Sequence, residues 1–164
     1  MEYFRVLFSN DYASRRGKFG LIETVPEIDN LDLVAYNAPF PTDEINALQF
    51  VLDGKAFADL QMCLYPWETI SKKFKELLEQ YCGSNLYFHP ITVDDGQTSK
   101  PYFIMHFKQT VGFNKSAFPD NKALLAGKQV EAFDDSITGV FFVSETVKRH
   151  IESEKLTGMY FDPL

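Results

Sequence analysis

Three histidines, His89, His106 and His150, are the residues of this 164-residue chain best suited to general acid–base or metal chemistry. They are scattered: His89 precedes a proline, His106 lies inside an apolar run, and His150 follows Arg149. A familiar active site would pair such a residue with a nucleophile, a second base or a metal cluster. The pattern therefore favours packing or surface roles for all three.

Neighbouring carboxylates and cysteines also lack the spacing that chemistry requires. Asp94-Asp95-Gly96 is typical of a turn and lacks the alternating ligands of a calcium loop, and Asp134-Asp135 is typical of a loop pair. Cys63 and Cys82 have no metal-ligand spacing, so we predict reduced, buried thiols, as in a cytosolic protein. No glycine-rich phosphate loop occurs. We expect no catalytic residues, metal or cofactor, and hence not an enzyme.

The net charge of −7 comes from a single stretch of the chain. Between Lys18 and Lys55 there is no Lys, Arg or His, while the other 16 acids balance the 16 Lys and Arg. The acids of this stretch are Glu23, Glu27, Asp29, Asp32, Asp43, Glu44 and Asp53. Nucleic acid is disfavoured as a partner because phosphate contacts need clustered Lys and Arg. The stretch is compatible with a basic protein partner, or with a solvated loop region that aids solubility.

The composition is typical of one globular domain with an aromatic core. Hydrophobic residues make up 45% of the chain, including 16 Phe and 8 Tyr. These large side chains have few rotatable bonds, so they fill a core at a small cost in conformational entropy. The opening residues include Glu2 and Arg5, so they are typical neither of a secretory signal nor of a membrane span. We expect a single domain over residues 1–164, with an acidic, strand- and loop-rich part at 1–65, located in the cytoplasm and without a membrane partner.

Short apolar runs bounded by Gly, Pro, Asn and Asp predict most of the strands. These runs lie at 2–9, 19–24, 31–36, 85–93, 102–107 and 139–143. Residues 43–52 are ambiguous between a short helix and a strand. The expected fold class is α+β, with a mixed or mainly antiparallel sheet and a few helices.

Two stretches carry an apolar stripe at helical spacing. The first predicts a helix over 70–81, with Ser71 as N-cap and Gly83 in a left-handed closing position. The second predicts a helix over 144–156, with Ser144 as N-cap and Glu145 placed favourably against the helix dipole.

Residues 70–91 align with residues 143–164 without a gap when the sequence is shifted by 73 positions. Identical residues occur at Ser71/Ser144, Lys75/Lys148, Glu79/Glu152, Tyr87/Tyr160, Phe88/Phe161 and Pro90/Pro163. They fall on the caps, the helical stripe and the following strand, as a duplicated helix–turn–strand unit would place them. Convergence on a common amphipathic pattern is the alternative.

The duplication predicts that the last residues, 158–164, form the counterpart of the strand at 85–91. Met159 and Phe161 are then expected to be buried. Pro163, like Pro90, is expected at an edge or a strand end, because proline cannot donate a backbone hydrogen bond.

The segment ITGVFFVSETVKRHIESEKLTGMYFDPL resembles the closing signature of a family of immunity proteins from bacterial polymorphic toxin systems. The matching residues are Val143, Ser144, Glu145, Lys148, Thr157, Gly158, Phe161 and Pro163. An earlier helix starting near Ser71, a Phe-x-Pro strand at Phe88 and Pro90, and the strand at 102–107 extend the resemblance over roughly the last 100 residues. The family's aspartate-rich stretch is replaced here by TVGFNKSAF at 110–118.

The resemblance implies a binding protein that neutralises a cognate toxin by occluding its active surface. Many toxins of this kind attack nucleic acids and are basic, so an acidic face would steer their association. The expected partner-binding residues are Glu23, Glu27, Asp29, Asp32, Asp43 and Glu44, with Tyr36 and Phe40 as aromatic anchors.

Two other classes of function stay open at this point. One is a small-molecule or regulatory binding module whose many aromatic side chains line a pocket. The other is an enzyme acting through residues that look structural, such as His106 with Tyr102 or Asp95. Oligomeric state is not predicted.

Overall fold

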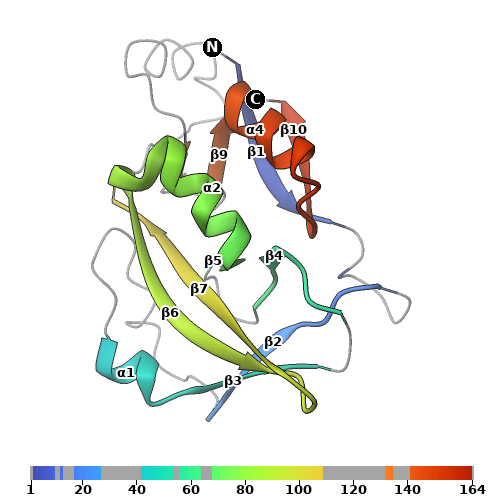
Figure 1. Ribbon diagram of the computed structural model, residues 1–164, viewed down its shortest axis with the longest axis vertical. Helices are drawn as coiled ribbons and strands as arrows, with labels where there is room; N and C mark the ends of the chain where they lie inside the picture. Colours follow the sequence, from blue (N-terminus) through green and yellow to red (C-terminus); the bar gives the residue numbers. More distant parts are fainter. Residues whose placement is uncertain are drawn as a thin grey trace, which may run out of the picture.

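Two β-sheets and three α-helices form the described part of the computed structural model (Figure 1). Described are residues 2–9, 12, 17–26, 42–53, 56–63, 68–108, 132–134 and 141–163. The strands are β1 (Tyr3–Phe8), β2 (Ile22–Val25), β3 (Gln49–Leu52), β4 (Leu60–Gln61), β5 (Glu68–Ser71), β6 (Leu86–Asp94), β7 (Ser99–Phe107), β8 (Ala132–Asp134), β9 (Phe141–Ser144) and β10 (Met159–Pro163). The helices are α1 (Thr42–Asn46), α2 (Lys72–Cys82) and α4 (Glu145–Ser153), with a 3₁₀ turn, η3 (Gly83–Asn85).

The strands pair mainly in antiparallel fashion. The four-stranded sheet has the order β10-β1-β9-β8, and the six-stranded sheet has the order β2-β3-β6-β7-β5-β4. Of the pairings that these orders contain, only that of β3 with β6 is parallel. The predicted α+β class with a mainly antiparallel arrangement is therefore confirmed.

The two segments of the 73-residue repeat belong to units with the same topology. The order β6-β7-β5-β4 in one sheet matches β10-β1-β9-β8 in the other. In each unit a helix, α2 or α4, joins two parallel strands that flank one antiparallel strand. This inner strand is β7 in the first unit, where it follows β6 through a hairpin, and β1 in the second, where it comes from the other end of the chain.

The register of the inner strand is the same in both units. Tyr102 of β7 lies opposite Ser71, and Tyr3 of β1 lies opposite Ser144. The inner strands also correspond in sequence, since YFIMHF at 102–107 matches YFRVLF at 3–8. The second unit therefore has the architecture of the first, with its inner strand supplied by the start of the chain.

The identical residues of the repeat occupy identical structural positions. Each N-cap serine accepts a hydrogen bond from an amide three residues later, at 3.2 Å in Ser71 and 3.3 Å in Ser144. Both predicted caps are confirmed. Such a cap contributes about 1 kcal/mol, because it satisfies an amide that the helix itself leaves unpaired.

The repeated Lys, Glu and Phe form one cluster on each helix. Lys75 lies 2.6 Å from Glu79 and 5.1 Å from the ring centroid of Phe88. Lys148 lies 2.9 Å from Glu152 and 5.6 Å from Phe161. In both units the amine also lies over a phenylalanine of the inner strand, Phe103 or Phe4. Each cluster therefore fastens a helix to two strands of its own sheet while its opposite charges neutralise each other.

Both units pack against one hydrophobic cluster. Its buried members from the first unit are Leu60, Ile70, Phe74, Leu77, Leu78, Cys82, Leu86, Met105 and Phe107, and those from the second are Val6, Phe141, Val143, Val147 and Ile151. The helices α2 and α4 lie side by side (Figure 1), with the rings of Tyr81 and His150 4.9 Å apart. A second cluster lies between the opposite face of the six-stranded sheet and α1.

Asp59 connects the two units. Its carboxylate accepts one hydrogen bond from the Ser71 hydroxyl, at 2.7 Å, and two from the amide and hydroxyl of Thr157, at 2.9 and 3.0 Å. Ser71 caps α2 in the first unit, and Thr157 leads into β10 in the second. Beside it the amide of Leu60 donates to the Thr157 carbonyl at 3.0 Å. The charged acceptor makes this junction stronger than one built of neutral hydrogen bonds.

At the end of the chain, one sequence-based expectation is confirmed and one is wrong. β10 is an edge strand, as Pro163 predicted. Met159 and Phe161 are half-buried rather than buried, because an edge strand is covered less completely than an inner one. Elsewhere, Gly83 was expected in a left-handed conformation but has φ −55° and starts the 3₁₀ turn, whereas Gly96 and Gly158 have positive φ, +89° and +93°.

The ambiguous stretch 43–52 contains both alternatives, since α1 ends at Asn46 and β3 begins at Gln49. Ile70, the first residue of the predicted helical stripe, lies in β5. The strand predicted at 31–36 lies outside the described residues, as does the TVGFNKSAF stretch. That the chain is a single domain stays a prediction.

Replacing Gly158 by alanine should destabilise the fold by about 3 kcal/mol or more, because the change combines a left-handed backbone with a steric clash. A Cβ at this position would overlap the Leu60 carbonyl oxygen and lie 2.8 Å from the Ala58 Cβ. Gly96 is the matched control: it has φ +89° but no atom within 4 Å of the added Cβ, so Gly96→Ala should cost only about 1 kcal/mol. Urea unfolding of both variants measures the difference, and equal losses would show that the clash is relieved.

Candidate functional site

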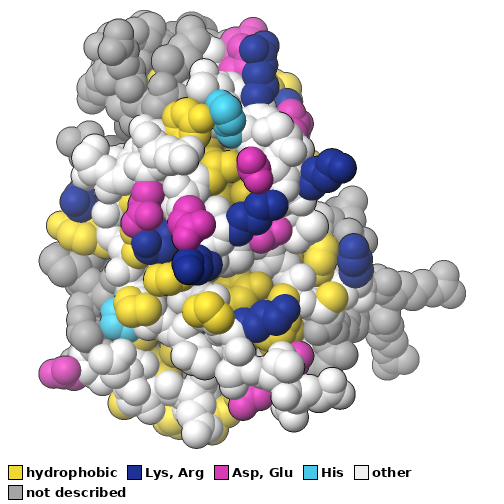
Figure 2. Space-filling model, in the orientation of Figure 1, with side chains coloured by type: hydrophobic (Ala, Val, Ile, Leu, Met, Phe, Trp, Pro, Cys, Tyr) yellow, Lys and Arg dark blue, Asp and Glu magenta, His cyan; other side chains and the backbone are white. Residues whose placement is uncertain are grey.

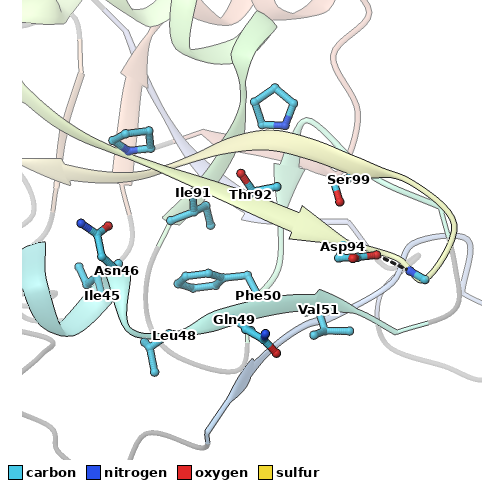
Figure 3. Close-up of a pocket in the computed structure, with 13 residues that line it drawn as sticks. Ile45, Asn46, Leu48, Gln49, Phe50, Val51, Ile91, Thr92, Asp94 and Ser99 are labelled. Carbon is cyan, nitrogen blue, oxygen red and sulfur yellow. Dashed lines mark hydrogen bonds between the residues drawn. The ribbon is translucent and has the colours of Figure 1, made fainter.

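A groove of about 720 Å³ lies between α1, β3 and the β6–β7 hairpin (Figure 3). Its apolar lining comes mainly from Ile45, Leu48, Phe50, Val51 and Ile91, and its polar lining from Asn46, Gln49, Thr92, Asp94 and Ser99. In Figure 3 the ring of Phe50 points from β3 towards Ile91, whereas Thr92 and Ser99 lie on the other side of the hairpin. The groove thus combines an apolar part with a polar rim, which is the usual composition of a binding site.

Local sequence signals place the walls of the groove. The helix α1 is short, and it is anchored because Ile45 is fully buried in the cluster that also contains Phe50. β3 then pairs with β6 only at Phe50↔Val93 and Val51↔Asp94. Because this pairing covers only the far end of β6, the groove opens along the rest of that strand.

The hairpin between β6 and β7 is held by its own aspartates. Asp94 accepts a hydrogen bond from the Gly96 amide at 2.7 Å, and Asp95 accepts from the amides of Gln97 and Thr98 at 2.9 and 2.7 Å. These amide bonds lower the pKa of Asp95, so its carboxylate stays ionised. The predicted turn at 94–96 is confirmed.

His89 joins α1 to β6 beside the groove. Its Nε2 lies 3.1 Å from the side-chain oxygen of Asn46, which lines the groove. Burial lowers the pKa of the imidazole, which favours the neutral ring. Because the Asn46 oxygen accepts, the contact is a hydrogen bond in the tautomer that carries its proton on Nε2. The contact gives His89 a positioning role for α1.

The end of the molecule that holds the groove, here called the groove end, has acidic residues but no Lys or Arg among the residues described there. The stretches 22–26, 42–53 and 86–99 contain no Lys or Arg. Their acids are Glu23, Asp43, Glu44, Asp53, Asp94 and Asp95. Figure 2 shows the same contrast: positive and negative side chains are interspersed over the helices, while the lower end of this view shows acidic and no basic side chains. The described residues of this end therefore carry a net negative charge.

The predicted partner-binding residues are only partly described. Glu23 is exposed on β2 and Asp43 is exposed on α1, and Glu44 lies in the same helix. Both elements stand at the groove end, next to β3. Glu27, Asp29, Asp32, Tyr36 and Phe40 lie outside the described residues, so their assignment stays a prediction.

The residues of the enzymatic alternative are not brought together. Tyr102 and His106 lie four residues apart on β7, about 13 Å along an extended strand. The Tyr102 hydroxyl donates to the Ala58 carbonyl at 2.7 Å, and burial together with the nearby Asp59 raises its pKa. Asp95 is engaged in the hairpin turn. Burial lowers the pKa of His106 as well.

A second cavity, of about 290 Å³, adjoins the junction at Asp59. Lys72, Lys73 and Lys100 line it, but the Asp59 oxygens already accept the three hydrogen bonds that hold the two units together. In the described ranges there is no group of three His, Cys, Asp or Glu that could hold a metal ion, and no helix long and apolar enough to cross a membrane. Cys63 and Cys82 are buried thiols that are not joined in a disulfide, as predicted.

Comparison with known proteins adds no assignment. Neither a protein-family model nor a curated protein sequence matches the chain.

Sequence reasoning did not identify Asn46, Phe50 and Thr92 as groove residues. The signal available for the first two was the ambiguity of stretch 43–52, since a helix and a strand that meet within ten residues must be joined by a tight turn. Thr92 carries no such signal, because its position depends on the pairing of β6 with β3.

Folding stability should fall as the pH is lowered from 7 to 5. The unfolded chain binds a proton near the ordinary histidine pKa of about 6.5, whereas folded His89 and His106 resist protonation, so acid favours the unfolded state. In His89→Gln this loss should be smaller, because one of the two groups is gone. Urea unfolding at several pH values measures both slopes, and an unchanged slope in the variant would rule out His89 as a source.

Proposed function

We propose that this protein is an immunity protein, which binds a cognate bacterial toxin in the cytoplasm and neutralises it by covering its active surface. The observation that carries the proposal is the groove end, where six acids and no Lys or Arg occur among the residues described. The resemblance of residues 137–164 to the closing signature of immunity proteins supports it independently.

In this proposal the acidic residues speed the association of the toxin, and the apolar residues contact it in the complex. A negative end raises the association rate of a basic toxin and imitates the phosphates that a nucleic-acid-directed toxin binds. The apolar groove residues then supply affinity, since Val51 is 37% exposed beside the buried Phe50. Val25 on the neighbouring edge strand is 52% exposed and extends the apolar area.

A small-molecule binding module is the second candidate. The groove volume of about 720 Å³ falls within the range of ligand pockets, about 300–1,000 Å³. A ligand for this groove would be cationic or neutral, because Asp94 is its charged lining residue among those described.

Co-expression tests the proposal directly. The protein should rescue growth from the toxin encoded beside its gene, but not from an unrelated toxin, and should co-elute with it on a sizing column. If the neighbouring gene product is neither bound nor neutralised, the proposal is wrong. Saturable binding of a small cation in the groove would then favour the second candidate.

Reversing charges at the groove end should slow toxin association about tenfold or more at low salt, and less at high salt. The variant is Glu23→Lys with Asp43→Lys, two exposed acids. Glu2→Lys with Glu76→Lys is the matched control, since it makes the same change in net charge on exposed residues outside the groove end. Stopped-flow association kinetics measure both, and equal slowing would attribute the effect to net charge alone.

A further inference from the structure

Among the described residues, no strand covers the outer edge of β6 along the groove. The amide of Lys108 donates to the Asn85 carbonyl at 2.8 Å, and the amide of Asp95 donates to the Thr98 carbonyl at 3.1 Å. These bonds lie at the two ends of the β6–β7 ladder. In an antiparallel pair, residues alternate between those whose backbone groups bond to the partner strand and those whose backbone groups point away from it. Asn85 and Asp95 both bond across the ladder, so the odd-numbered residues of β6 bond to β7. The even-numbered residues direct their backbone groups outwards.

Beyond this outer edge, β3 pairs with β6 only at Val93 and Asp94. From Leu86 to Thr92 the described ranges place no strand next to β6. Pro90 lies at an outward position, where it has no amide to offer. The Leu86 amide donates to the Gly83 carbonyl, so the donors that face this edge are the amides of Phe88 and Thr92. Pro90 and Thr92 line the groove.

The two sides of this edge differ in chemistry. On one side lie Ile91 and the ring of Phe50, and on the other lie Thr92 and Asp94 (Figure 3). Lys100 is the nearest base along β7, but its amine lies 4.5 Å from the ring centroid of Phe57, which stacks on buried Tyr102. This contact holds the positive charge on the opposite face from Ser99, so it does not neutralise Asp94 in the groove.

We propose that the groove binds an extended, basic segment of the toxin as an added β-strand along the outer edge of β6. The proposal rests on the function proposed above and names its mode of contact. Backbone groups of the segment bond to the amides of Phe88 and Thr92. Alternate side chains then face Phe50 and Ile91 if apolar, and Asp94 if basic. Pro90 limits pairing to a short segment, which discourages edge-to-edge association of two copies.

Hydrogen exchange in the toxin complex tests the strand directly. The amides of Phe88 and Thr92 should exchange at least tenfold more slowly in the complex than in the free protein. The amides of His89 and Ile91 are internal controls, since they face β7 and are protected in both states. A stable complex in which Phe88 and Thr92 exchange at unchanged rates would overturn this inference and leave the immunity function standing.

A peptide experiment separates this inference from the identity of the toxin. An end-capped (Lys-Val)₄ peptide should shift the NMR signals of β6 and β3, and (Glu-Val)₄ should not. A (Lys-Val)₄ peptide with alternate amides N-methylated should bind at least tenfold more weakly, because it cannot pair as a strand. Absence of (Lys-Val)₄ binding, or shifts centred on the other open edge at β10, would overturn the inference.

Asp94→Asn supplies the matched change in the protein. An asparagine keeps the side-chain oxygen that accepts from Gly96, so the hairpin is retained. We expect the affinity for (Lys-Val)₄ to fall several-fold. Asp53→Asn removes an equal charge from an exposed residue that does not line the groove, and should have little effect. If both variants bind equally well, Asp94 is not the recognising charge.

Discussion

The fold depends on filling the gap between two parallel strands. In each unit a helix crosses from one strand to a parallel strand two positions away, and an antiparallel strand must occupy the position between them, or buried backbone groups stay unpaired. In the first unit β7 follows β6 directly and closes the gap locally. In the second unit β1 arrives from the start of the chain and places Phe4 opposite Pro163. The two ends of the chain therefore lie together (Figure 1), and residues 159–163 near the C-terminus form the strand β10 of that sheet.

Local signals in the sequence predicted much of this fold. The N-cap serines, the helical stripes and the closing strand each depend on a few neighbouring residues, and they appear where expected. The equivalence of residues 3–8 and 102–107 was missed because their shift is 99 positions rather than 73, so no single shift aligns both whole units. Arg5 in place of Ile104 hides it further. The prediction of a left-handed Gly83 was wrong because a short 3₁₀ turn, rather than a left-handed residue, leads α2 into β6.

The candidate site was predicted only by its charge. Glu23 and Asp43 are carried by elements at the groove end, but the groove itself depends on the parallel pairing of β3 with β6. That pairing joins residues about forty positions apart and leaves no local pattern. The same pairing reaches no further along β6 than Val93, so it leaves the Thr92 amide beyond the last paired residue.

The two units differ in the part of the chain to which the proposed function assigns binding. The charged side chains that the two units share are paired with each other: Lys75 pairs with Glu79, and Lys148 with Glu152. In the described residues, α1, β2 and β3 extend only the first unit, and β6 has nine residues where β10 has five. Neither four-stranded unit needs this extension to close its own sheet. In the proposed function, this extension with its unbalanced acidic charge is the part that contacts the partner.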